Sequence, residues 1–291
     1  MPMNTNSISA PTPVWKSAWP IMLGLLVLYF PMYKEMAHTL WPHEEFAHGP
    51  LVLAVVLWLL WMGRSKLADA GQRKNAVSGA ILLSIGLFLY IVGHSQDIYL
   101  FETGSQIPVL LGILLLMYGA GIAKEFWFPI LFLVFLIPLP GVLIDTLTGP
   151  LKQQISALVE SILYMFGYPI ARSGVTLSIG QYQLLVADAC SGLNSMFSLS
   201  ALGLFYAYLV RRPGLVHNTI LLGSILPIAF FANLMRVILL VLITYYFGDD
   251  VGQGFAHKAA GVVLFMAALI SFVVLDGTIQ LARTRLARQV K

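Results

Sequence analysis

Long apolar segments recur along the whole chain, and they constrain its fold more than any other feature of the sequence. A helix that crosses the hydrocarbon core of a bilayer needs about 20 mostly apolar residues, and fewer where flanking side chains reach the interface. Hydrophobic residues make up 58% of the chain and charged residues 10%, against about a quarter in soluble domains. We therefore expect an all-α polytopic membrane protein that forms one domain over 1–291, with a disordered start at 1–14. The eight candidate spans are 15–33, 48–63, 77–94, 105–122, 126–144, 193–210, 215–247 and 258–276.

The Lys and Arg residues predict how these segments are oriented. With a cytoplasmic N-terminus, 12 of the 17 basic residues fall in cytoplasmic segments, among them Arg211, Arg212 and the basic group near the C-terminus. Basic residues are enriched in the cytoplasmic loops of membrane proteins. We therefore expect both termini in the cytoplasm.

The segment 215–247 is too long for one straight span. At about 1.5 Å per residue it would form a helix of nearly 50 Å, whereas the hydrocarbon core is about 30 Å thick. We expect it to tilt, to kink at Pro227 or to continue past the membrane surface. On a straight helix, Arg236 would lie about 35 Å from Arg212, close to the outer surface.

The segment 140–189 differs from the rest, and we expect it to form an extracytoplasmic insertion. Gly149 and Pro150 are typical of a helix start, and the residues after them have an amphipathic pattern that favours a helix along the outer interface. Apolar and polar residues then alternate over 174–186, which predicts a β-hairpin turning near Gly180 and Gln181. A hairpin must sit above the membrane or against protein, because lipid cannot satisfy its backbone.

Three polar residues are expected at the same outer boundary, on three different spans. They are Cys190, which is the only cysteine, Arg236 and His257. Helix N-termini, histidinium and arginine all lower the pKa of a thiol, so Cys190 could attack as a thiolate. His257 could then protonate a leaving amine, and Arg236 could stabilise an oxyanion or clamp a substrate carbonyl. The combination predicts thiol-based acyl transfer.

Each of these residues also has a purely structural interpretation. A lone cysteine is commonly a buried hydrophobic residue, His257 could be an interfacial ring with satisfied nitrogens, and Arg236 could extend to lipid headgroups. Their shared depth in the predicted topology favours the functional interpretation, and the structural one stays open.

A metal site is not expected from the most suggestive motif. His43 and His48 bracket two glutamates, as in a zinc protease, but they are five residues apart. The HExxH motif needs a spacing of four to place both rings on one helix face. The acidic pair Asp249 and Asp250 is open to two interpretations, solvated charge or a cation site. We expect no metal and no cofactor.

Four stretches of the sequence resemble the exosortase/archaeosortase family of membrane-embedded cysteine transpeptidases. They are 187–195 (ADACSGLNS), 233–236 (NLMR), 256–257 (AH) before the final span, and a His-Gly element within 41–51. The resemblance covers essentially the whole chain and implies a catalytic set of Cys190, Arg236 and His257. The remaining polar candidates in these stretches, proposed for substrate binding, are Ser191, Asn194, Asn233 and His48. One departure is Asp188, where many members carry Glu.

The resemblance also implies a substrate and a location. The substrates would be exported proteins that end in a Pro-Glu-Pro-like motif, a transmembrane helix and a basic tail, cleaved through a thioester that passes to an acceptor nucleophile or to water. The enzyme would lie in the bacterial inner membrane with its active site at the periplasmic face and with exopolysaccharide-system partners, and no nucleic-acid partner is expected. Two other functions stay open: a transporter or polysaccharide-export component, and a membrane scaffold without chemistry.

Overall fold

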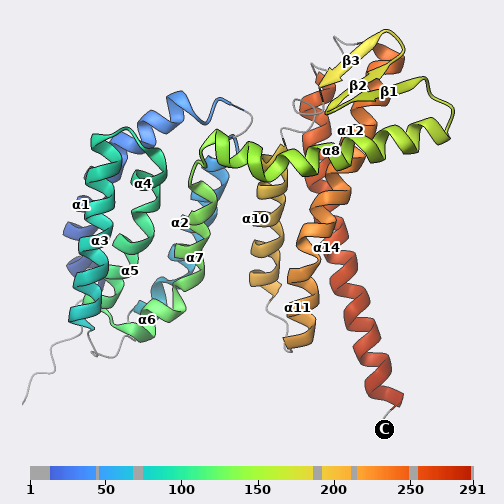
Figure 1. Ribbon diagram of the computed structural model, residues 1–291. Coiled ribbons are helices and arrows are strands. Elements are labelled where there is room, and N and C mark those ends of the chain that lie inside the picture. The colour runs from blue at the N-terminus through green and yellow to red at the C-terminus, as the bar shows by residue number, and fades with distance from the viewer. Residues whose placement is uncertain are drawn as a thin grey trace, which may run out of the picture. The chain divides into compact units, whose positions relative to one another are not determined.

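A computed structural model describes the backbone of residues 14–43, 46–67, 75–185, 192–210, 215–248 and 255–289 (Figure 1). The chain divides into two compact units, Met1–Pro138 and Leu139–Lys291, and each is described by itself. The segment predicted to be disordered, 1–14, lies outside the described residues apart from Val14, where the first helix begins.

The first unit is helical throughout its described elements. These are α1 (Val14–Thr39), α2 (Gly49–Met62) with the 3₁₀ helix η1 (Gly63–Leu67), α3 (Ala76–Ser95), α4 (Tyr99–Gly104), α5 (Gln106–Met117), α6 (Ala120–Glu125), α7 (Trp127–Phe132) and the 3₁₀ helix η2 (Leu133–Leu136). Helices α3 and α5 pack closely because glycines lie at their contact. A Cβ atom on Gly86 would come within 2.8 Å of the backbone nitrogen of Val109, which is closer than side-chain carbons approach in proteins. Small residues allow this kind of close approach between membrane helices.

The second unit combines helices with a small sheet. Its elements are α8 (Gly141–Met165), β1 (Ile170–Ser173), β2 (Thr176–Ile179), β3 (Tyr182–Leu185), α10 (Gly192–Val210), α11 (Leu215–Gly223), α12 (Ile225–Phe247) and α14 (Phe255–Gln289). Helices α10, α12 and α14 pack against one another, and α8 lies across one end of this group (Figure 1).

The sheet contains the predicted hairpin and one strand more. Strands β2 and β3 pair antiparallel around the turn at Gly180 and Gln181, with Ile179 opposite Tyr182. The additional strand, β1, pairs antiparallel with β2 and is not evident in the sequence pattern. Buried residues of β2, such as Leu177, share one hydrophobic core with residues of α8 and α12. The sheet therefore lies against protein, as its backbone requires.

Within the part of the chain that the structure describes, five helical segments are long and apolar enough to cross a membrane, whereas the sequence predicted eight spans. They are Gly49–Leu67, Ala76–Ser95, Tyr99–Met117, Val216–Phe247 and Ala259–Arg285, and two shorter apolar helices are Trp127–Leu136 and Phe197–Val210. The structure thus supports a mostly helical multi-pass protein, and the count of eight stays a prediction.

The predicted span 126–144 is wrong in its extent, and prolines explain why. The helical residues of η2 end at Leu136, and Ile137 and Pro140 have ψ angles of 117° and 137°. A proline restricts the residue before it to extended conformations and donates no backbone hydrogen bond, so Pro138 and Pro140 stop the helix. Helix α8 begins directly after them, earlier than the predicted start at 149, and contains Pro150.

The long segment 215–247 is interrupted. Helix α11 ends at Gly223 and α12 begins at Ile225, so the break falls at Ser224. Pro227 has no N–H to donate to the carbonyl of Gly223, which is four residues earlier, and this missing hydrogen bond favours a break at that point. Ser224 itself keeps helical angles, φ −77° and ψ −12°, and its N–H donates to the carbonyl of Ile220, so a kink at Pro227 stays a prediction.

Candidate active site

Arg236 is a buried cation in the middle of the apolar helix α12. Only 6% of its surface is exposed, and Asn233, one turn earlier, is also buried. The surrounding helix is apolar enough to cross a membrane. A charged side chain in such a segment is costly and is retained where it serves a function or finds polar partners. Arg236 is therefore the described residue from which the candidate site can be built.

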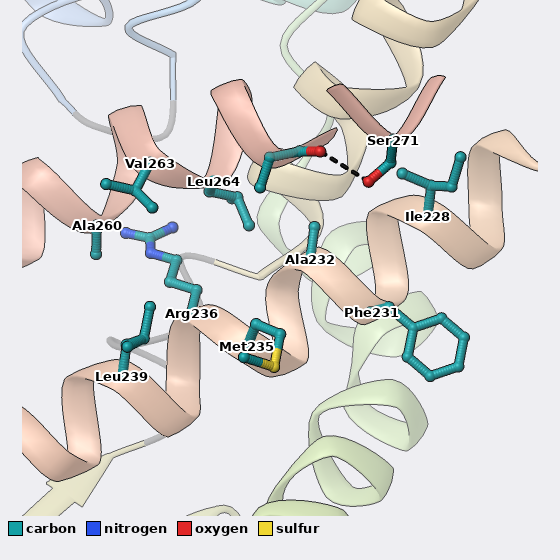
Figure 2. Close-up of a pocket in the computed structure, with 11 residues that line it drawn as sticks. Ile228, Phe231, Ala232, Met235, Arg236, Leu239, Ala260, Val263, Leu264 and Ser271 are labelled. Carbon is teal, nitrogen blue, oxygen red and sulfur yellow. Dashed lines mark hydrogen bonds between the residues drawn. The ribbon is translucent and has the colours of Figure 1, made fainter. Parts of the chain in front are cut away.

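A cavity of about 460 Å³ separates part of α12 from α14, and Arg236 lies in its wall. Figure 2 shows the guanidinium extending from α12 toward α14, beside Ala260 and Val263. At the other end of the cavity, the hydroxyl of Ser271 donates a 2.7 Å hydrogen bond to the carbonyl of Ala267, within α14 itself. The other lining residues are apolar, so Arg236 is the one charged side chain that the described lining presents.

Helices α12 and α14 frame this cavity by packing against each other at both of its ends. Leu240 packs with Ala260 near one end, and Ala229 shares a core with Ala268 and Phe272 near the other. These pairs show that the two helices run in opposite directions. Arg236 therefore lies at the end of the cavity that is nearer to the start of α14.

The other two predicted catalytic residues are described in part or not at all. Cys190 and Ser191 lie outside the described residues. Asn194 belongs to α10 and His257 to the first turn of α14, but their side chains lie outside the description. His257 precedes the cavity residue Ala260 by three positions. The meeting of thiol, guanidinium and imidazole therefore stays a prediction.

His48, a predicted substrate-binding residue, has a structural role in the first unit. Its Nε2–H donates a hydrogen bond of 3.1 Å to the carbonyl of Phe135, which ties the start of α2 to η2. The following residue, Gly49, packs against the indole of Trp41, and a Cβ atom there would clash with that ring. The His-Gly element is thus explained locally by packing, and a role in substrate binding is still a prediction.

A buried polar cluster in the second unit was missed by the sequence analysis. His217 of α11 donates from Nε2 to Oδ1 of Asp276 in α14 over 2.7 Å, and the hydroxyl of Tyr206 in α10 lies 3.4 Å from Oδ2. Both His217 and Asp276 are buried. In the sequence, His217 and Asp276 are a single histidine and a single carboxylate within apolar segments. Asp276 is also the last residue of the final predicted span, so nothing indicated that the two side chains meet.

The first unit also contains a buried carboxylate that the sequence did not predict. Glu102 of α4 is almost fully buried, and its Oε1 accepts a hydrogen bond of 3.1 Å from Nδ1 of His94 in α3. Gly93 makes room for this contact, because a Cβ atom there would come within 2.8 Å of the Glu102 Cα.

The structure offers one observation on metal binding. Among the described residues, no group of three or more His, Cys, Asp or Glu side chains is arranged to hold a metal ion. The acidic pair Asp249 and Asp250, for which a cation site was one interpretation, lies outside the described residues. Solvated charge and a cation site therefore both remain interpretations of this pair.

The chain was compared with known protein families, curated proteins and solved structures. Residues 40–274 match the family model described as transmembrane exosortase (Exosortase_EpsH). No curated protein and no solved structure matches the chain. The matched region contains every residue of the candidate site.

Proposed function

Because the chain belongs to the transmembrane exosortase family, we propose that it is a cysteine peptidase and transpeptidase that cleaves the C-terminal sorting signals of exported proteins. Membership in this family implies the processing of sorting signals. The finer elements of the proposal are the thioester mechanism, the catalytic set of Cys190, Arg236 and His257, and the Pro-Glu-Pro-like motif.

In the proposed reaction, the thiolate of Cys190 attacks the carbonyl carbon of the scissile peptide bond. The negative charge that develops on the carbonyl oxygen is stabilised by the guanidinium of Arg236. The carbon–nitrogen bond then breaks, and the imidazolium of His257 donates a proton to the departing amine. A thioester to Cys190 remains.

The second half of the reaction releases the product and restores the enzyme. An acceptor nucleophile, or water, attacks the thioester carbonyl while the neutral imidazole of His257 takes its proton. The carbon–sulfur bond breaks and the thiolate of Cys190 leaves. The atoms and charges of both halves balance, so no cofactor is needed.

The observation that carries this proposal is the buried Arg236 in the wall of a cavity beside α14. In a low-dielectric site, a buried cation stabilises a developing oxyanion more strongly than an exposed one. The position of His257 in the first turn of α14 is compatible with a shared site, because α14 begins at the end of the cavity where Arg236 lies.

The test is processing in cells by variants of the single cysteine. We expect Cys190→Ala and Cys190→Ser to leave the precursor of an exported substrate uncut while the amount of the membrane protein is unchanged. A thioester intermediate would also be trapped by hydroxylamine with the wild-type chain and not with Cys190→Ala. Normal processing by the alanine variant would refute the proposal.

A second function, as a component of transport or polysaccharide export, is favoured by one observation. Buried ionisable pairs within membrane segments are typical of transport pathways, and His217 and Asp276 form such a pair. This function predicts that Asp276→Asn abolishes export of the transported molecule and that Cys190→Ala leaves it intact. If instead Cys190→Ala abolishes substrate processing and Asp276→Asn leaves it intact, the result supports the peptidase.

A further inference from the structure

One end of the first unit gathers basic and tryptophan side chains on its surface. Trp61 lies near the end of α2, Arg64 and Lys66 belong to η1, Lys124 belongs to α6 and Trp127 begins α7. All five side chains are exposed. We call these five residues the basic-aromatic patch. None of them has a part in the candidate active site.

The packing of η1 against the end of α6 brings the patch together. Lys66 forms an ion pair with Glu125. Gly63 lies so close to Phe126 that a Cβ atom on it would come within 2.9 Å of the ring. Leu67 packs against the same core as Phe126. Residues that are 59 positions apart in the sequence are therefore joined at one surface.

The patch lies where a membrane-crossing segment ends. The segment Gly49–Leu67 is long and apolar enough to cross a membrane, and Arg64 and Lys66 are among its last four residues. At about 1.5 Å per residue, its 19 residues measure roughly 28 Å, close to the thickness of the hydrocarbon core. Its basic end therefore lies at the level of the lipid headgroups, where tryptophan is also enriched.

The charges of the patch suit a bound anion. Its three basic side chains and the neighbouring Glu125 give a net charge of +2. Among the described carboxylates, none forms an ion pair with Arg64 or Lys124. The centre of the Arg64 guanidinium lies 4.2 Å from the centroid of the Trp61 ring. This contact holds the arginine in place and leaves N–H donors for a phosphate, which a guanidinium binds through two parallel hydrogen bonds.

We propose that the basic-aromatic patch binds an anionic phospholipid. The negative headgroup lies at the basic side chains, and the acyl chains lie along the exposed tryptophans. Basic residues beside a membrane-crossing helix attract anionic lipids in this way. The inference does not depend on the proposed function, and it gives a ligand to the first unit, which has no part in the proposed reaction.

A soluble anion is the main competing ligand, and the apolar side chains of the patch argue against it. Trp61, Met62 and Trp127 are 58%, 51% and 52% exposed beside the basic residues. A soluble phosphate has no apolar part to cover them, whereas a phospholipid has one. A zwitterionic phospholipid also carries a phosphate, but its headgroup has no net charge, so the net positive charge of the patch favours an anionic headgroup.

Lipid binding to the delipidated full chain in detergent, read by native mass spectrometry, tests the proposal. The probes are phosphatidylglycerol and phosphatidylcholine with the same acyl chains, so that only the headgroup differs. We expect the apparent dissociation constant for phosphatidylglycerol to be about tenfold lower or more. Arg64→Gln and Lys124→Gln should each reduce this preference about threefold, and together they should nearly abolish it. Lys66 is left unchanged because it pairs with Glu125.

Matched controls separate the patch from general charge and general apolarity. Lys34→Gln with Arg172→Gln removes two positive charges at exposed positions of α1 and β1 and should keep the full preference. Trp61→Leu removes the ring beside Arg64 and should weaken binding of phosphatidylglycerol about threefold. Trp19→Leu, at a 60% exposed position of α1, should leave that binding unchanged.

Three results would overturn the proposal. The first is equal binding of the two lipids by the wild-type chain. The second is a full preference for phosphatidylglycerol in the chain with Arg64→Gln and Lys124→Gln. The third is displacement of phosphatidylglycerol by inorganic phosphate beyond the effect of chloride at equal ionic strength, which would assign the patch to a soluble anion.

Discussion

At the residue scale, Arg236 shows what a sequence can reveal about a membrane protein. Within apolar segments an isolated cation is conspicuous, so Arg236 was predicted as a site residue from sequence alone and is buried beside a cavity. The pair of His217 and Asp276 was not predicted, because its members are 59 residues apart and each looked like the end of a span. A contact between distant segments depends on helix packing, which no local pattern encodes.

Replacement of Arg236 by lysine tests whether the guanidinium does more than carry charge. Lysine keeps the positive charge but loses the planar fork of donors, so we expect Arg236→Lys to lower substrate processing by about 100-fold or more. The measurement is the rate of precursor cleavage in membranes. Arg172→Lys is the matched control, because Arg172 bonds Glu160 at the sheet. Equal rates for both lysine variants would contradict a role for the guanidinium.

The buried pair of His217 and Asp276 is expected to matter for stability. Removing the imidazole leaves the buried carboxylate of Asp276 without the hydrogen bond from His217, so His217→Ala should lower the free energy of unfolding in detergent by about 3 kcal/mol or more. Thr278→Ala, at an exposed position in the same helix as Asp276, should change it by less than about 0.5 kcal/mol. The double variant with His217→Ala and Asp276→Ala should lose less free energy of unfolding than the two single variants lose in sum. Strict additivity would show that the pair is not coupled.

At the element scale, the periodicity of the sequence predicted the regular elements better than their ends. The span 77–94 corresponds to α3, and alternation predicted β2 and β3 with their turn. Strand β1 was missed because Ile170–Ser173 is short and carries Arg172 and Ser173, so it lacks a clear apolar pattern. The span 126–144 was predicted to run through two prolines, and their effect on the backbone ends the helix there.

The small sheet is expected to depend on its inward face. Leu177 is 0% exposed beneath α8 and α12, whereas Leu185, on the neighbouring strand, is 41% exposed. Leu177→Ala creates a cavity in this core and should lower the free energy of unfolding by about 2 to 5 kcal/mol. Leu185→Ala removes the same atoms at an exposed position and should cost less than about 1 kcal/mol. Similar losses in both variants, measured in detergent, would refute the assignment of the inward face.

At the scale of the whole molecule, the alternation of the spans stays a prediction, and three contacts within the units are compatible with it. In the first unit, Lys66 forms an ion pair with Glu125, and the hydroxyl of Tyr99 donates to Glu35. In the second unit, the hydroxyls of Tyr168 and Tyr246 are 3.0 Å apart. Each contact joins residues that the sequence assigned to the same side of the membrane. The prediction of which side faces the cytoplasm rests on the basic residues alone.

The orientation can be measured with cysteines placed in the Cys190→Ala chain, where no native thiol remains. Gln183 of β3 and Ser65 of η1 are exposed and lie on opposite sides in the predicted topology. A thiol reagent that does not cross the inner membrane should label Gln183→Cys in intact cells, because the sheet is expected in the periplasm. It should label Ser65→Cys only after the membrane is opened, because the loop with Arg64 and Lys66 is expected in the cytoplasm. The opposite labelling pattern would invert the topology, and it would place the cavity end with Arg236 at the cytoplasmic side, where an exported substrate does not arrive.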